Sequence, residues 1–147
     1  MTSQLKLRAQ NGDDIAVFSA VLQDAIFKVE DIHWNPTNKR LTAICNRYRW
    51  EAKKRWFKRH PERVRCAFHF SGVLKAERLG INAANGPEVL NLLALEAKSQ
   101  GDESAEIVLT FSGNASIRLQ VECIEAVLSD VSESWDALSE PKHELSE

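Results

Sequence analysis

Apolar residues recur along this chain first at the spacing of a helix and then at the spacing of strands. The helical spacing involves Ile15, Phe18, Val21, Leu22 and Ala25, which fall on one face of about three turns. The turn residues Asn11-Gly12 precede this stretch, and Asp13 or Asp14 is placed to cap the helix and to offset its dipole. We therefore predict one N-terminal α-helix.

From residue 26 onward the apolar spacing is two, the period of a β-strand. Segments 26–34 and 40–50 predict a β-hairpin closed by the turn Asn35-Pro36-Thr37-Asn38. In its first strand Phe27 and Val29 share one face, while Ile26, Ile32 and Trp34 share the other. Residues 64–70 form the clearest half-buried strand, and Ser71-Gly72 predicts a bulge or bend before a strand at 73–77.

The second half of the chain continues with alternating segments. Segments 107–111 and 117–123 are predicted to pair through the turn at 112–114, and Leu5 and Leu7 suit a short first strand. Two segments fit more than one structure. Residues 90–95 suit an interior strand or a short helix, and residues 122–131 suit a bulged strand slightly better than a helix.

These elements predict a single α+β domain over residues 1–131, followed by a polar, mobile tail at 132–147. The N-terminal helix is expected to pack on a mostly antiparallel, curled sheet of about six or seven strands. The short connections leave no room for parallel crossovers. The expected core consists of Ile15, Phe18, Leu22, Ile44, Phe68, Phe70, Leu93, Ile107, Leu109, Phe111, Leu119 and Val121.

The composition of the chain also predicts its cellular location. The chain has 147 residues, of which 44% are hydrophobic and 27% charged, as in ordinary globular proteins. It shows no membrane-spanning run and no signal peptide, so we expect a cytoplasmic protein without a membrane partner. Cys45, Cys66 and Cys123 are far apart and lie in strand patterns, which predicts buried free thiols.

The charge is unevenly distributed. Nine basic and two acidic residues lie between Arg47 and Arg65, a local net charge of +7 in a chain of net charge −2. Tyr48, Trp50, Trp56 and Phe57 are interleaved with these cations. The expected contact residues are Arg47, Arg49, Trp50, Lys53, Lys54, Arg55, Trp56, Lys58 and Arg59.

Three interpretations of this basic stretch (residues 47–65) are open. It can be a solvated loop, a contact for a protein partner or a second copy of the chain, or a weak nucleic-acid surface on which aromatic rings stack with bases. Arg47 and Arg49 also have a structural alternative, because Glu30-Asp31 and Glu51 can neutralise them across the hairpin. Asn46 is expected to turn inward and to need hydrogen-bond partners there.

The sequence supports an enzymatic function less than it supports a binding function. The chain has no P-loop, GxGxxG, HExxH or CxxC motif, so no cofactor or metal is expected. A hydrolase would pair Cys45 or Cys66 with His69, yet strand alternation puts Cys66 and His69 on opposite faces. A metal site from His33, His69 and Glu30 or Asp31 would have to form across neighbouring strands.

The chain from Leu5 to about Trp135 resembles an uncharacterised bacterial family, domain of unknown function 2948. The resemblance rests on LQDAIFKVEDIHW, NRYRWE, RCAFHFSGVLKAERLGI and IRLQVECIEAVLSDV. It implies a small cytoplasmic protein of one domain and supplies no catalytic residue. Together these observations predict a non-enzymatic binding domain for a protein partner or itself, with nucleic-acid binding as the alternative and a small hydrolase or metal-dependent enzyme as the third possibility.

Overall fold

The computed structural model describes residues 5–49, 62–81, 89–132 and 135–136. The elements in chain order are β1 (Lys6–Ala9), α1 (Gly12–Val21), β2 (Ile26–Asn35), β3 (Arg40–Tyr48), β4 (Glu62–Phe70), β5 (Val73–Leu79), β6 (Val89–Ser99), β7 (Ala105–Phe111), β8 (Ala115–Val121), β9 (Ala126–Asp130) and β10 (Trp135–Asp136). The described residues thus form an α+β domain with more strands than predicted.

Helix α1 is capped by its preceding residue. Asn11 Oδ1 accepts a hydrogen bond from the Asp14 main-chain nitrogen at 2.9 Å, and the Asp14 carboxylate accepts one from the Gln10 nitrogen at 2.8 Å. The prediction that Asp13 or Asp14 is the cap is wrong, because Asn11 has the extended backbone that a cap requires. The two aspartates instead lie in the first turn, where their charge offsets the helix dipole.

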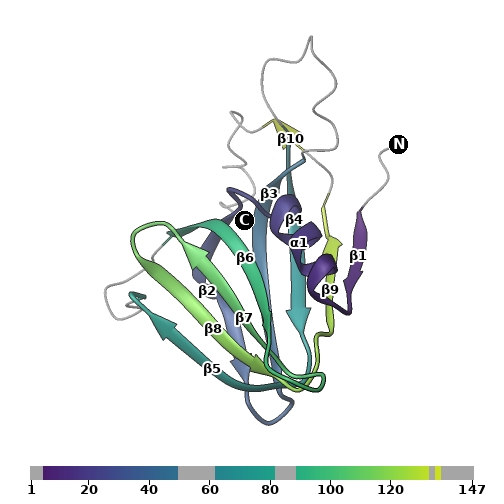
Figure 1. Cartoon of the computed structure of the whole chain (residues 1–147). Helices are drawn as coiled ribbons and strands as arrows, with labels where there is room; N and C mark the ends of the chain where they lie inside the picture. Colours follow the sequence, from purple (N-terminus) through teal and green to yellow (C-terminus); the bar gives the residue numbers. More distant parts are fainter. Residues whose placement is uncertain (1–4, 50–61, 82–88, 133–134, 137–147) are drawn as a thin grey trace.

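All strand pairs in the described residues are antiparallel, and the sheet stays open. The order is β1-β9-β4-β3-β2-β6-β7-β8-β5, with β10 also paired to β4. The curled sheet folds over itself, so that β6, β7, β8 and β5 lie in front of β2 and β3 in Figure 1. Helix α1 packs against β6 and β1.

The core fills the space between the two halves of the sheet. One half consists of β1, β9, β4, β3 and β2, and the other of β6, β7, β8 and β5. Phe27 of β2 contacts Phe68 of β4 and Phe111 of β7 edge to face, with ring centroids 5.8 and 5.5 Å apart. Edge-to-face contacts are a favoured geometry for aromatic pairs. These rings join strands from both halves, and most of the predicted core residues are buried around them.

Two predicted core residues are not in the core. Leu93 is 48% exposed, because the β6–β7 register shifts between Leu92 and Ala94 and leaves Leu92 and Leu95 facing inward. Ile44 is only half-buried, because Ala43 and Cys45 occupy the inward positions of β3. Asn46 shares the outer phase with Ile44, so the expectation that it turns inward is wrong as well.

The ambiguous segments are strands. Residues 89–99 form β6, and residues 122–131 contain β9. The break in alternation at Cys123-Ile124 is a change of strand rather than a bulge, because β8 ends at Val121 and β9 pairs with β1 and β4. Cys123 therefore lies in a turn and is half-buried, which corrects its predicted place in an apolar strand.

The chain after β9 keeps following β4. The Val131 nitrogen donates to the Arg65 carbonyl, the Ser132 hydroxyl accepts from the Arg65 nitrogen, and β10 pairs with Arg63 and Glu62. Part of the segment predicted as a tail thus lies on the sheet. Among the described residues no helix has the length and apolar character needed to cross a bilayer.

Candidate functional site

Only two of the nine predicted contact residues lie in the described part of the chain. They are Arg47 at the end of β3 and Arg49 just after it. The other seven lie outside the described residues, namely Trp50, Lys53, Lys54, Arg55, Trp56, Lys58 and Arg59.

Arg47 is a buried structural residue and not a surface contact. Its side chain is 0% exposed, and it binds the 3% exposed carboxylate of Asp130 through two hydrogen bonds of 2.9 Å, from Nε and Nη2. Nη1 donates to the Tyr48 carbonyl at 2.9 Å. Asp130 also accepts from the Leu5 nitrogen at 3.0 Å. A buried charge needs such partners, so the Arg47 guanidinium is held inside the fold and does not lie at the surface.

Arg49 has a structural partner too. Its Nη1 donates to the Glu62 carboxylate at 2.9 Å, and its main-chain nitrogen donates to the Glu62 carbonyl at 2.7 Å. The predicted partners of Arg47 and Arg49, Glu30 and Asp31, are therefore wrong, and Glu51 lies outside the described residues. Arg63 packs over the Tyr48 ring, 3.9 Å from its centroid.

The alternation contained a signal for this pair that the sequence reasoning missed. Arg47 continues the inward phase of Leu41, Ala43 and Cys45, and Asp130 continues that of Ala126 and Leu128. A charge on the apolar phase of a strand requires an opposite charge on another strand. Which strand supplies it depends on the sheet order, which the sequence does not reveal.

The candidate nucleophiles are poorly suited to chemistry. Cys45 and Cys66 lie directly opposite each other on β3 and β4 and are both buried. Burial raises the pKa of the Cys45 thiol well above its usual value. The hydrogen bond and the charge interaction between Cys45 and Cys66 raise this pKa further. A protonated, buried thiol is a poor nucleophile.

The histidines do not complete a site with these thiols. Burial lowers the pKa of His69, and the charge of Arg40 lowers it further. His69 alternates with the inward Cys66, so the predicted separation of these two side chains on opposite faces is confirmed. In the described ranges no three histidine, cysteine, aspartate or glutamate side chains are grouped to hold a metal ion.

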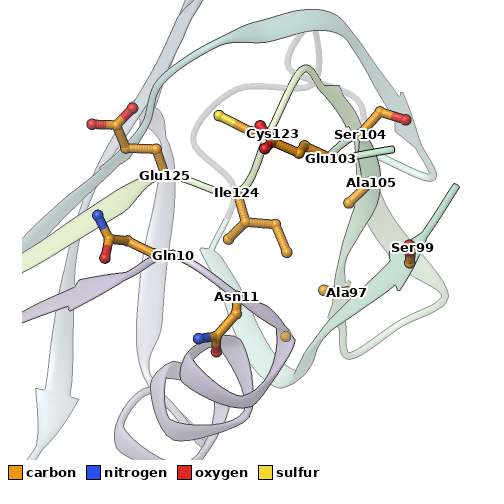
Figure 2. A pocket seen from close by; sticks show the side chains of 11 residues that line it. Gln10, Asn11, Ala97, Ser99, Glu103, Ser104, Ala105, Cys123, Ile124 and Glu125 are labelled. Carbon is orange, nitrogen blue, oxygen red and sulfur yellow. The ribbon is translucent and has the colours of Figure 1, made fainter. Parts of the chain in front are cut away.

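One hollow lies between the start of α1, the 122–125 turn and the β6–β7 hairpin. It has a volume of about 610 Å³. Figure 2 shows Ile124 in its middle, with Gln10 and Asn11 on one side and Glu103 to Ala105 on the other. The helix N-terminus here is already capped and carries Asp13 and Asp14. The exposed side chains of Glu103 and Glu125 add negative charge, so the hollow does not favour an anion.

A second hollow has a different character and is the candidate site. It is a groove of about 360 Å³ between the two halves of the sheet, and we call it the β2–β5 groove. Its lining residues are Val29, Ile32 and Trp34 of β2, Leu41 of β3, Ala76, Glu77 and Arg78 of β5, Ile117 of β8, and Ile81. A mainly apolar hollow with few polar groups is typical of small-molecule sites.

The groove exists because the sheet does not close there. Among the described residues, β2 pairs with β6 only from Ile26 to Lys28, and the rest of β2 pairs on one side alone, with β3. β5 likewise pairs only with β8 among the described strands. The register of β2 shifts between Phe27 and Ile32, and this shift brings Val29, Ile32 and Trp34 to the groove side together. The predicted assignment of Val29 and Ile32 to opposite faces is therefore wrong.

Comparison with known proteins gives a family and nothing finer. Residues 5–143 match the family described as "Protein of unknown function (DUF2948)", so the chain belongs to this family over nearly its whole length. No curated protein and no solved structure matches the chain.

Proposed function

We propose that this protein is a non-enzymatic cytoplasmic binding domain whose ligand places an apolar group in the β2–β5 groove. The observation that carries the proposal is the groove itself, which holds apolar side chains half-open to solvent. Trp34, Val29, Ile32 and Ile81 are each only partly buried there and pack against the core. Covering such surface stabilises a complex by roughly 25 cal/mol for each Å² removed from water.

The walls of the groove are suited to binding because they are strands and not loops. β2 and β3 form one wall, and β5 and β8 form the other. Each wall is held by antiparallel pairs, β2 with β3 and β5 with β8, and each pairing contains one register shift. Side chains on such elements keep their positions, so little ordering cost is added when a ligand binds.

An uncharged hydrophobic fluorophore, N-phenyl-1-naphthylamine, tests this proposal. Its fluorescence is expected to rise with the wild-type protein and to show saturation. Ala76→Phe fills the groove from β5 and is expected to abolish the rise, while Ala97→Phe fills the hollow of Figure 2 and is expected to leave it unchanged. Loss of the signal in Ala97→Phe alone would assign binding to the other hollow, and no saturable signal would refute the proposal. Melting curves would confirm that both variants fold.

A second candidate function, contact with a protein partner or a second copy, involves the basic stretch. The supporting observation is the set of contacts made by the residues that flank segment 50–61. Arg49 and Glu62 lie at the two ends of segment 50–61 and are joined by side-chain and main-chain hydrogen bonds. The buried Arg47–Asp130 pair fixes the end of β3 beneath them. Arg49 and Glu62, which flank the segment, are therefore held side by side, and this limits the ordering cost of any contact made there.

Reversal of Lys53, Lys54 and Lys58 to glutamate tests this second candidate. Self-association, measured by sedimentation equilibrium, is expected to be lost while the melting temperature is unchanged. Binding of a single-stranded RNA oligonucleotide by the wild-type protein, with a steep loss of affinity as salt rises and with dependence on Trp56, would favour the nucleic-acid alternative instead.

A further inference from the structure

We propose that the ligand of the β2–β5 groove is an amphipathic carboxylate of the fatty-acid type. Its chain would lie between the two walls, and its carboxylate would bind the guanidinium of Arg78. This inference rests on the proposed function of the groove and adds the chemical class of the ligand.

Arg78 is placed at the groove by the register of β5. It pairs with Ile117 of β8, and Ala76 pairs with Leu119, both of which are buried. Residues directly opposite each other in a sheet point to the same face. Arg78 therefore belongs to the inward phase of β5 and lines the groove beside Ile117, although it remains exposed at the edge.

The charge of Arg78 is not neutralised within the described residues. It forms no hydrogen bond or ion pair with any of them, whereas the neighbouring Glu77 carboxylate lies 3.6 Å from Lys75 Nζ. Lys75 and Glu77 share the other phase of the strand. A guanidinium offers paired donors that match the two oxygens of a carboxylate. The groove therefore combines an apolar interior with two charged lining residues, Arg78 and a Glu77 carboxylate that already lies near Lys75.

This combination selects an amphipathic anion over other ligands. Val29, Ile32, Trp34 and Leu41 offer no hydrogen-bonding side-chain group except the indole nitrogen, so a polar or highly charged ligand would lose its hydration without compensation. The volume of about 360 Å³ is near the lower end of the range for small-molecule sites. A short or medium alkyl chain with one carboxylate satisfies both features.

Displacement of N-phenyl-1-naphthylamine by decanoate and by decanol tests the inference. Both compounds are expected to displace the fluorophore, and decanoate is expected to bind more tightly. Arg78→Gln should weaken decanoate by roughly tenfold, the effect of losing one charge-assisted hydrogen-bonded contact, and should leave decanol unchanged. Arg118→Gln is the matched control. It removes the same charge from the neighbouring strand, where the Arg118 side chain is 48% exposed and lies on the outer phase.

The outcomes separate the inference from the proposed function. Equal binding of decanol and decanoate, or equal effects of Arg78→Gln and Arg118→Gln, would overturn the carboxylate assignment and leave the apolar groove standing. Weaker decanol binding in Arg78→Gln would also overturn it, because Arg78 would then act by packing its stem over the apolar surface. If neither the fluorophore nor the two compounds bind, the proposed function itself fails.

Discussion

The ion pair between Arg47 and Asp130 ties together strands that are distant in the sequence. Asp130 ends β9, Arg47 lies near the end of β3, and the Leu5 nitrogen precedes β1, so three strands meet at one carboxylate. The pair is almost completely buried. In the protein interior its Coulombic attraction is strong, but the cost of desolvating the two charges is large. Its role is therefore to specify how these strand ends join, and loss of one partner should be costly.

Asp130→Asn is expected to lower the free energy of unfolding by about 3–5 kcal/mol, because it leaves the buried guanidinium of Arg47 without a counter-charge. Urea denaturation followed by tryptophan fluorescence measures this change. The control is Glu122→Gln, which breaks the exposed pair of Lys39 and Glu122, with side chains 54% and 49% exposed. That pair should contribute no more than about 1 kcal/mol. Similar effects of the two substitutions would contradict a structural role for the buried pair.

The three cysteines are expected to differ in reactivity, although the sequence predicts that all three are buried free thiols. In the folded protein only the half-buried Cys123 should react readily with an aromatic disulfide reagent, because Cys45 and Cys66 are buried and burial raises the pKa of Cys45. Absorbance should report one thiol in the native state and three in urea. Cys123→Ser should remove the native reaction, and rapid reaction of a second native thiol would revive the nucleophile hypothesis.

At the scale of elements, local pattern predicts what each segment is but not how neighbouring segments align. The helix at 12–21 and the hairpin around residues 36–39 follow from spacing and turn residues, which act over a few positions. The shifts in β2 and β6 are irregularities within the hairpins that these strands form with the next strands, β3 and β7. They decide that Ile32 faces the groove and that Leu93 faces solvent, and an interpretation based on strict alternation therefore misplaced both residues.

The candidate site, too, could not be predicted from local sequence pattern. The basic stretch stands out in the sequence because its charge and rings are contiguous, yet its first cation, Arg47, is buried. The β2–β5 groove draws residues from four strands and exists only where the sheet stays open. Its members, such as Trp34 and Ile117, read as ordinary strand residues. Arg78 could be noticed only once its register with β8 was known.

Gly80 and Gly113 provide a test of how β5 is held at its end. Both have positive φ, +72° and +75°, but a Cβ on Gly80 would lie 2.5 Å from the Asn114 carbonyl oxygen, while one on Gly113 would meet nothing within 4 Å. Gly113→Ala should cost about 1–2 kcal/mol for its left-handed backbone. Gly80→Ala should lower the free energy of unfolding by the same amount and by about 1–3 kcal/mol more, because its Cβ would also collide with the Asn114 carbonyl oxygen.

Chemical denaturation of both variants measures the difference. A larger loss in Gly80→Ala would confirm that the end of β5 packs tightly against the β7–β8 turn, next to the groove wall. Equal losses in the two variants would mean that this end of β5 moves away at little cost, and the groove would then lack a fixed second wall.

At the scale of the molecule, one continuous core unites the two halves of the curled sheet. Phe27, Phe68 and Phe111 come from strands in both halves and meet in edge-to-face contacts. Phe70 extends the cluster along β4, with its ring centroid 5.9 Å from that of Phe68. Because the same rings pack against both halves, neither half can lose its packing without the other, and unfolding is expected to be a single cooperative transition.

Phe68→Ala is therefore expected to lower the free energy of unfolding by about 3–5 kcal/mol, through lost burial and the cavity it leaves. Near-ultraviolet and far-ultraviolet circular dichroism should still give coincident transitions, since the damage is shared by both halves. Leu93→Ala is the matched control, because Leu93 follows the same apolar pattern in the sequence but is 48% exposed in β6. Its cost should stay within about 0.5 kcal/mol. A large loss in Leu93→Ala would place β6 in the other register, and separate transitions in Phe68→Ala would show that the halves fold independently.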